Sequence, residues 1–597
     1  MGYTGSPAYL GGLYYFSFGF AHIPAHLQEE MMALGAFTFV LHSHLPYVRM
    51  AGRWPHGEEM LHEAIAETYT PLLNALYDLR EEGVDFRLAI GITPILMEQL
   101  ADEDVKKHFT TYLEERIQLA EEDYKIHINR GEEAIASLAL FYRNWYSSIL
   151  ESYTGRFGKD LLGAFRRLQD EGFVEVLTSA ATHAYLPLLD QDSSIYAQLR
   201  VGVQTYYRHM GRMPRGIWLP ECGYRPGYMR DPRPGEPIKH SYYKPGLEEF
   251  LADLNLHFFF TDSYVIEGGR MVGKVAGDVV GPYGGVPRRR LVLKTDELPT
   301  IRRGTTFRPY YIRAARVAVF GRDEGTSLQV WSATYGYPGD YLYREFHRKD
   351  EHSGLKYWRV TGAQVDLGQK ELYDPERAKG QVRLHVDHFC GLVKERLANF
   401  HRSTGQYGII VSAYDTELFG HWWFEGILWL KEVLRSLYHD PEVELTTPSS
   451  YLERFPPTEA MAIPESSWGL GGAHWTWLNP ETEWMWPLIH NAERTMEEMV
   501  KLYPDASEPM REVLNQAARE LLLLQASDWP FLISTSQAKD YATARFQQHV
   551  ARFNHLISIA RRGKMSPEDR EFVAEISRLD NPFPDIDYRI FARREQE

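Results

Sequence analysis

Short apolar runs that stop at polar or small residues recur along the chain and predict buried β-strands. Six of these runs lie at residues 37–41, 86–90, 174–178, 257–261, 407–413 and 443–446. A seventh begins at Ile217 and stops abruptly at Glu221, which lies between Pro220 and a Cys-Gly turn. Helical or irregular segments separate most of the runs, and this alternation predicts an α/β fold with a parallel sheet, open or closed.

Two stretches show helical periodicity instead. Between 102 and 170, Val105, Phe109 and Tyr112 recur at helical spacing, charged residues fill the other faces, and no proline interrupts the pattern. From 461 to 597 the chain is again mostly helical after a Gly-rich start. We expect an α/β unit at 35–460 with a helical insertion at about 102–170, followed by a C-terminal helical domain at 461–597.

Other segments have no regular period. Residues 225–246 contain five prolines, and 264–316 are rich in Gly, Arg and Tyr, so both predict long loops. The strand-like pattern begins only at Phe37. We therefore expect residues 1–34 to be an extension that is disordered or not native, with Met31 or Met32 as an alternative start.

Composition and charge restrict the partners. The net charge of −16 argues against binding to nucleic acid or to an anionic membrane surface. The apolar run at 9–20 is too short to span a bilayer and lacks a basic leader. Cys222 and Cys390 form no CxxC pair, so we expect neither a disulfide framework nor a thiolate metal site, and we expect a cytoplasmic location.

Aromatic residues make up 13% of the chain and include 14 Trp. Sugar rings stack on aromatic faces, so a carbohydrate ligand is one interpretation, and a well-packed Tyr-rich core is the other; composition alone leaves both open. The Gly-rich loop at 464–479 carries Trp468, Trp475 and Trp477 without helical or strand period. For these indoles we favour stacking on a ligand.

The candidate chemistry lies at the predicted strand ends. Glu221 ends one apolar run, and Asp415 ends another, followed by Glu417. In a barrel of parallel strands the carboxyl ends of the strands form the functional rim. Two acids at that rim, 194 positions apart (415 − 221), suggest paired-carboxylate chemistry.

Three histidines also follow predicted strands. His42 and His44 share one face of an extended segment, and His183 follows the run at 174–178. A metal site would need a third ligand besides His42 and His44, such as His183. Hydrogen bonding to a hydroxyl-rich substrate needs no further ligand. We favour the second interpretation. The Ser527-Asp528 segment interrupts the C-terminal helical pattern and is placed to bring a carboxylate to the rim.

Five ordered motifs carry a resemblance to a known family. They are HSHLPY at 42–47, ATHAYLP at 181–187, WLPECGY at 218–224, YDTELFGHWWFEG at 414–426 and ESSWGLGGAHWTWLN at 465–479. Together they resemble the signature regions of glycoside hydrolase family 57, and most of all those of its 1,4-α-glucan branching enzymes. The resemblance extends from about residue 35 to the C-terminus.

The resemblance implies an incomplete, seven-stranded (β/α) barrel with a helical insertion, and a C-terminal helical domain that lines the cleft. Glu221 would be the nucleophile and Asp415 the general acid/base. The residues implied to line the subsite of the reacting sugar are His42, His44, Trp54 and His183. Those in stretches that resemble glucan-contacting positions are Arg322, Trp331, Gly339, Trp468, Trp477, Asp528 and Gln537. Tyr283 is the candidate for a lid tyrosine that favours transfer over hydrolysis.

The implied reaction cleaves an α-1,4-glucan by retaining double displacement and transfers the chain to a 6-hydroxyl. It requires the two carboxyls about 5–5.5 Å apart and needs no metal or cofactor. The expected partner is α-1,4-glucan, and the expected state is a monomer or small homo-oligomer. The alternatives are an amylase-like hydrolase or 4-α-glucanotransferase, a metal-dependent deacetylase-like barrel using His42, His44 and an Asp, and a non-catalytic glucan-binding protein.

Overall fold

The computed structural model describes residues 33–53, 56–231, 240–268, 304–312, 315–332 and 336–593. Trp54, Tyr283 and nearly all of the predicted N-terminal extension lie outside these residues. None of the helices within the described ranges is both long enough and apolar enough to cross a membrane.

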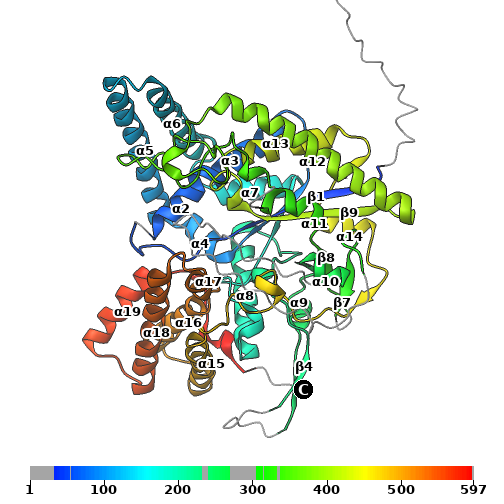
Figure 1. The fold of residues 1–597 in the computed structure, drawn as a ribbon. Coiled ribbons are helices and arrows are strands. Elements are labelled where there is room, and N and C mark those ends of the chain that lie inside the picture. Colours follow the sequence, from blue (N-terminus) through cyan, green and yellow to red (C-terminus); the bar gives the residue numbers. More distant parts are fainter. Residues whose placement is uncertain are drawn as a thin grey trace, which may run out of the picture.

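A parallel sheet forms the centre of the molecule (Figure 1). Strand β1 (Gly35–Ser43) pairs along most of its length with β9 (Gly408–Asp415). Its last residues pair with β2 (Leu88–Ile92), its first residues pair with β10 (Val443–Leu445), and β2 continues to β3 (Val174–Leu177). Residues on both faces of β1 and β2 are buried, as expected of a parallel sheet covered by helices.

A second sheet contains four strands. Strands β6 (Phe258–Thr261) and β8 (Ala318–Gly321) pair in parallel, and β7 (Tyr310–Ile312) is antiparallel to β8. At the edge of this sheet, β11 (Ala460–Met461) pairs in parallel with β7. Parallel bridges from Thr178 to Ile217 and from Gly216 to Phe258 connect β3 to β6.

On the remaining side, the backbone N–H of Asp323 donates to the Val411 carbonyl at 2.9 Å, which joins the end of β8 to β9. The parallel segments therefore follow the order β9, β1, β2, β3, 216–217, β6, β8, and the predicted α/β class is confirmed.

Three sequence predictions of strands and loops need correction. The run that ends at Glu221 forms only a two-residue bridge, because Pro220 has no N–H and Glu221 turns away with φ 60°. The predicted loop at 264–316 holds strand β7, and strand β8, which follows it, was not predicted. The proline-rich loop at 225–246 holds the antiparallel strands β4 (Tyr228–Arg230) and β5 (Tyr242–Lys244), which project from the body (Figure 1).

Helices surround these strands. The bounds around the barrel are α2 (Glu58–Ala64), α3 (Thr70–Glu81), α4 (Pro94–Ala101), α7 (Leu161–Asp170), α8 (Asp192–Met210), α9 (Leu247–Asp253), α10 (Ser263–Glu267), α11 (Glu324–Trp331), α12 (Pro375–Thr404), α13 (Gly426–His439) and α14 (Pro448–Arg454). A π-helical turn at Ile65–Tyr69 separates α2 from α3. Such turns often lie at functional sites.

The segment predicted as a helical insertion contains α5 (Glu103–Asn129) and α6 (Glu133–Glu151), which pack side by side (Figure 1). The Asp102 side chain begins α5 by accepting hydrogen bonds from the backbone N–H groups of Asp104 and Val105. The pair packs through buried side chains such as Phe109 and Tyr142.

The C-terminal region is helical, with α15 (Met485–Leu502), α16 (Glu508–Leu524), α17 (Asp528–Ser534), α18 (Lys539–Arg562) and α19 (Pro567–Leu579). One continuous hydrophobic cluster joins these helices to β6, α8 and the segment that follows β3. The C-terminal helices are therefore fixed against the barrel, with the start of α17 facing its rim.

Candidate active site

Polar side chains follow the carboxyl ends of the parallel strands, where they share one rim. In the register of β1 with β9, His42 lies opposite Asp415. Asp262 follows β6 and Arg322 follows β8, and the Arg322 guanidinium pairs with the Asp262 carboxylate at 2.9 Å. The fold thus brings to one rim residues that are far apart in sequence.

Glu221 lies in a tight turn with left-handed backbone angles, φ 60° and ψ 25°. This conformation is unfavourable for a residue with a side chain, and strain of this kind clusters at functional sites. The half-buried carboxylate accepts a 2.7 Å hydrogen bond from the Trp468 indole N–H and a 3.4 Å bond from the Ser527 hydroxyl. Burial raises the pKa of Glu221 to about 7, although the Trp468 bond and the charge of His44 oppose the rise.

Asp415 ends β9 with its side chain half-buried. Burial raises the pKa of Asp415 well above its usual value, the charges of Glu417 and Glu221 raise it further, and Arg322 acts against them. Among the described residues, no donor hydrogen-bonds the Asp415 carboxyl. The group therefore favours its protonated form and is free to bond a ligand.

Glu221 and Asp415 influence each other electrostatically across the rim, since the charge of Glu221 raises the pKa of Asp415. Ionisation of both carboxyls at once is unfavourable in these surroundings, so the pair can hold one proton at neutral pH. One ionised and one protonated carboxyl is the state that nucleophile and general-acid chemistry requires.

The three predicted histidines form a stacked group. The rings of His44 and His183 are stacked with centroids 3.9 Å apart, and Nε2 of His42 lies 3.0 Å from Nε2 of His183. Burial and the neighbouring histidines lower the pKa of both His42 and His183 well below the usual value, so these two rings are neutral and share one N–H. Because their nitrogens bond each other, the geometry favours hydrogen bonding over metal ligation.

The start of α17 completes this side of the rim. Asp528 pairs with Nε2 of His44 at 3.0 Å, and Thr93 contacts the other ring nitrogen of His44 at 3.0 Å. Burial lowers the pKa of His44, but the charge of Asp528 and its hydrogen bond outweigh burial, so the pKa is raised. The Ser527 hydroxyl contacts Nδ1 of His183 at 2.9 Å. Asp528 thus lies where the interrupted helical pattern predicted a carboxylate.

Two predicted tryptophans lie beside the carboxyls. Trp468 contacts Glu221 directly, and the Arg322 guanidinium lies 5.9 Å from its ring centroid. The Trp331 ring is 37% exposed and lies edge-on to Trp468 at 6.3 Å. Trp331 also donates its indole N–H to the Ala413 carbonyl at 3.5 Å, two residues before Asp415. Both rings therefore border the space next to the carboxyls.

The prediction that Trp477 stacks on a glucan does not fit the structure. Its side chain is only 1% exposed, and its ring is stacked on Tyr185 with centroids 4.1 Å apart. The aperiodic loop suggested an open ring, but Tyr185, from a distant part of the chain, covers it. Trp477 instead holds the Gly-rich loop against the barrel.

Other predicted residues have no contact with the carboxyls. Gly339 ends an exposed turn after Tyr337, and Gln537 lies in the connection between α17 and α18. Within the described ranges, no hydrogen bond or ion pair joins either residue to Glu221 or Asp415. Their roles in glucan binding stay predictions, as do those of Trp54 and Tyr283.

Sequence reasoning noted Glu417 and Ser527 but gave neither a role, and it missed Tyr69. The Glu417 carboxylate accepts hydrogen bonds from the Tyr69 hydroxyl and, at 3.2 Å, from the His44 backbone N–H. Burial raises the pKa of Glu417 to about 7. The position of Glu417, two residues after Asp415, could have indicated that it lies at the same rim. Tyr69 comes from the π-helical turn, and Ser527 from the distant C-terminal region, so only the fold reveals their roles.

Comparisons with known proteins match most of the chain to one family. The profile of Glycosyl hydrolase family 57 matches residues 38–464, and the profile described as "1,4-alpha-glucan branching enzyme, C-terminal" matches residues 488–591. A 1,4-alpha-glucan branching enzyme of Thermococcus kodakarensis is 45% identical over 551 residues, which cover 92% of this chain and 77% of the relative.

Two solved structures extend the comparison. The branching enzyme of Pyrococcus horikoshii superposes with a TM-score of 0.82 at 42% identity, covering 94% of this chain and 98% of that structure. The α-amylase AmyC of Thermotoga maritima superposes with a TM-score of 0.77 at 31% identity, covering 94% of this chain and 100% of that structure. The chain belongs to glycosyl hydrolase family 57.

Proposed function

We propose that this protein is a 1,4-α-glucan branching enzyme. It cleaves an α-1,4 bond of a glucan and transfers the released chain to a 6-hydroxyl, which creates an α-1,6 branch. The relatives at 42–45% identity are branching enzymes, and a branching-enzyme profile covers most of the C-terminal helices. An α-1,4-glucan is therefore the substrate class.

The roles of the two carboxyls follow from their surroundings. Glu221 is the nucleophile that attacks the anomeric carbon, because the Trp468 N–H and the charge of His44 favour its ionised form. Asp415 is the general acid, because burial and two neighbouring carboxylates keep its proton. After the leaving chain departs, Asp415 takes the proton of the incoming 6-hydroxyl.

The single observation that supports this pairing most strongly is the chain of contacts along one rim. Ser527 contacts both Glu221 and His183, Nε2 of His183 lies 3.0 Å from Nε2 of His42, and His42 lies opposite Asp415 in the register of β1 with β9. Retention of configuration requires two carboxyls at about 5–5.5 Å, whereas inversion requires about 6.5–9.5 Å to seat a water. We propose that a bound glucose unit lies between Glu221 and Asp415, with Trp468 and Arg322 beside it.

Hydrolysis is the alternative with a specific observation in its favour, since the Thermotoga α-amylase has the same fold. The higher identity to branching enzymes and the match at 488–591 favour transfer. A lid tyrosine at Tyr283, a cytoplasmic location, and a monomer or small homo-oligomer remain proposals from the sequence.

Proton NMR of amylose incubated with the purified protein tests the function. We expect a growing α-1,6 anomeric signal without a matching rise in reducing ends. Glu221→Gln and Asp415→Asn serve as controls and should give no α-1,6 signal above background. Reducing ends that accumulate without any α-1,6 signal would establish hydrolysis and overturn the proposal.

A further inference from the structure

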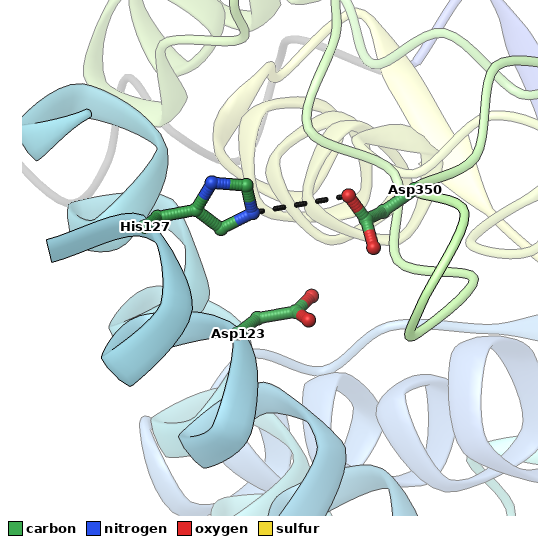
Figure 2. A group of neighbouring side chains, drawn as sticks. All are labelled: Asp123, His127 and Asp350. Atoms are coloured by element: carbon green, nitrogen blue, oxygen red, sulfur yellow. Dashed lines mark ion pairs between the residues drawn. The ribbon is translucent and has the colours of Figure 1, made fainter. Parts of the chain in front are cut away.

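Outside the rim, three ligand-type side chains converge between the insertion and a distant loop. Asp123 and His127 lie one turn apart on α5, and Asp350 comes from the segment that precedes α12 (Figure 2). All three point into one space, and one ligand atom from each lies within 4.8 Å of the others. In the described part of the chain, no contact joins this cluster to Glu221 or Asp415.

His127 is oriented as a metal ligand would be. Its Nδ1 contacts the Glu132 carboxylate at 2.6 Å, so this nitrogen carries a proton, and in the neutral ring Nε2 then presents a lone pair. Nε2 lies 3.8 Å from Oδ2 of Asp350, too far for a hydrogen bond. The His127 side chain is 8% exposed, so the ring lies largely inside the protein. A metal-binding histidine commonly donates the N–H of its other ring nitrogen to a carboxylate, as His127 does to Glu132.

The carboxylates are held in place on their outer sides. Asp123 is 0% exposed and accepts hydrogen bonds from the Tyr357 hydroxyl at 2.5 Å and from His352 Nδ1 at 2.9 Å. Asp350 uses Oδ1 to accept from the backbone N–H groups of His352 and Ser353, which leaves Oδ2 facing His127. Each carboxylate oxygen has a second lone pair available for an ion.

The cluster also lacks a permanent positive charge. Among the described residues, no lysine or arginine nitrogen lies within 4.0 Å of a carboxylate oxygen of Asp123, Asp350 or Glu132, and their ion-pair partners are histidines alone. A buried carboxylate is costly unless a cation compensates it. Either a protonated histidine or a bound metal ion must supply that charge.

A second cluster of the same residue types differs on this point. Glu520, His549 and Asp580 are fully buried within the C-terminal helices. There the Arg552 guanidinium pairs with Asp580, so a fixed cation already compensates the acids. That cluster is explained by internal pairing, whereas the one on α5 is not.

We propose that Asp123, His127 and Asp350 bind a divalent metal ion of the zinc class that fastens helix α5 to the loop around residue 350. One imidazole with two carboxylates suits zinc and its neighbours, whereas calcium and magnesium prefer oxygen ligands alone. Zinc binds such atoms at about 2.0–2.2 Å, so the three side chains need to close only slightly around it. The site is structural, and the reaction of Glu221 and Asp415 does not depend on it.

Zinc titration of the full-length, metal-stripped protein tests the proposal. Calorimetry with zinc chloride should show about one high-affinity site per chain, and calcium chloride should give no comparable heat. Zinc should also raise the thermal midpoint of unfolding, because it binds the folded state. In Asp350→Asn, which keeps the amide oxygen for the backbone N–H groups, zinc affinity should fall at least about 10-fold.

Two more variants separate this site from surface binding and from misfolding. His108→Ala removes another histidine of α5, which contacts Glu58 at 2.8 Å outside the cluster, and zinc affinity should not change. Glu132→Gln alters a half-exposed supporting residue, so it should fold normally and weaken zinc about 10–100-fold. Circular dichroism checks the fold of each variant. No zinc binding in the wild type, or binding that Asp350→Asn and Glu132→Gln leave unchanged, would overturn the proposal.

Discussion

The indole N–H of Trp468 donates a 2.7 Å hydrogen bond to Oε2 of Glu221. The same residue also donates its backbone N–H to the Glu221 carbonyl at 3.0 Å. The Gly-rich loop is therefore tied twice to the turn that carries the nucleophile. Through this contact, a loop outside the barrel controls both the position and the ionisation of a barrel residue.

Trp468→Phe should move the acidic limb of the pH–activity profile to higher pH. The indole bond favours ionised Glu221, whose pKa is already raised by burial to about 7. Loss of a hydrogen bond to a charged group costs about 1.5–3 kcal/mol, which corresponds to a shift of about one pH unit or more. The measurement is the initial rate of branching from pH 5 to 9.

Trp331→Phe is the matched control for this prediction. Trp331 borders the same space but donates its N–H to the Ala413 carbonyl rather than to Glu221. We expect weaker glucan binding with an unchanged acidic limb. If both variants shift the limb equally, the indole bond of Trp468 does not set the ionisation of Glu221.

Glu417→Gln should move the alkaline limb to lower pH. The charge of Glu417 helps to raise the pKa of Asp415, and glutamine removes that charge while keeping an oxygen for the Tyr69 and His44 donors. Asp415 then loses its proton at lower pH, by about one unit if the interaction is about 1.4 kcal/mol. The acidic limb, which follows Glu221, is the internal control, and an unmoved alkaline limb would contradict the role of Glu417.

Glu221→Gln should stabilise the fold at alkaline pH. The folded-state pKa of about 7 lies above the usual 4.5. Burial of Glu221 therefore does not lower the free energy of unfolding below pH 4.5, but it lowers this free energy as the pH rises to 7, and the loss persists above pH 7. Allowing for partial solvation, the gain at pH 8 is roughly 1–3 kcal/mol. Urea unfolding at pH 5 and pH 8 measures it.

Glu498→Gln provides the comparison for that experiment, because Glu498 is 65% exposed in a surface ion pair with Arg561. Its effect should stay within about 0.5 kcal/mol at both pH values. A Glu221→Gln variant no more stable than wild type at pH 8 would show that the carboxyl is better solvated than its surroundings indicate.

Much of the barrel could be predicted because strands covered on both faces form apolar runs. The runs at 37–41 and 407–413 mark β1 and β9, and His42 and Asp415 follow them closely, so both the strands and their chemistry were visible. Strand β8, Ala318–Gly321, was missed because it directly follows the irregular segment at 264–316 that was predicted to be a long loop. The run before Glu221 looked like a full strand, but the left-handed turn at Glu221 ends it early.

The site could be predicted only where a local signal existed. Glu221, Asp415 and the histidines follow strands, so their positions pointed to the rim. The break in the helical pattern marked the Ser527-Asp528 segment, but the role of Ser527 itself arises from contacts with His183 and Glu221 across more than 300 positions. Trp477 was misassigned for the same reason, because the Tyr185 ring that covers it is 292 positions away (477 − 185).

The most direct test of the central claim is to trap the sugar on the nucleophile. The Asp415→Ala variant, given a glucosyl donor with an activated leaving group, should form the covalent intermediate but remove it slowly, because no general base remains. Peptide mass spectrometry should then find the sugar attached to Glu221. A sugar on Glu417 or another residue, or no covalent adduct while product still forms, would contradict the account.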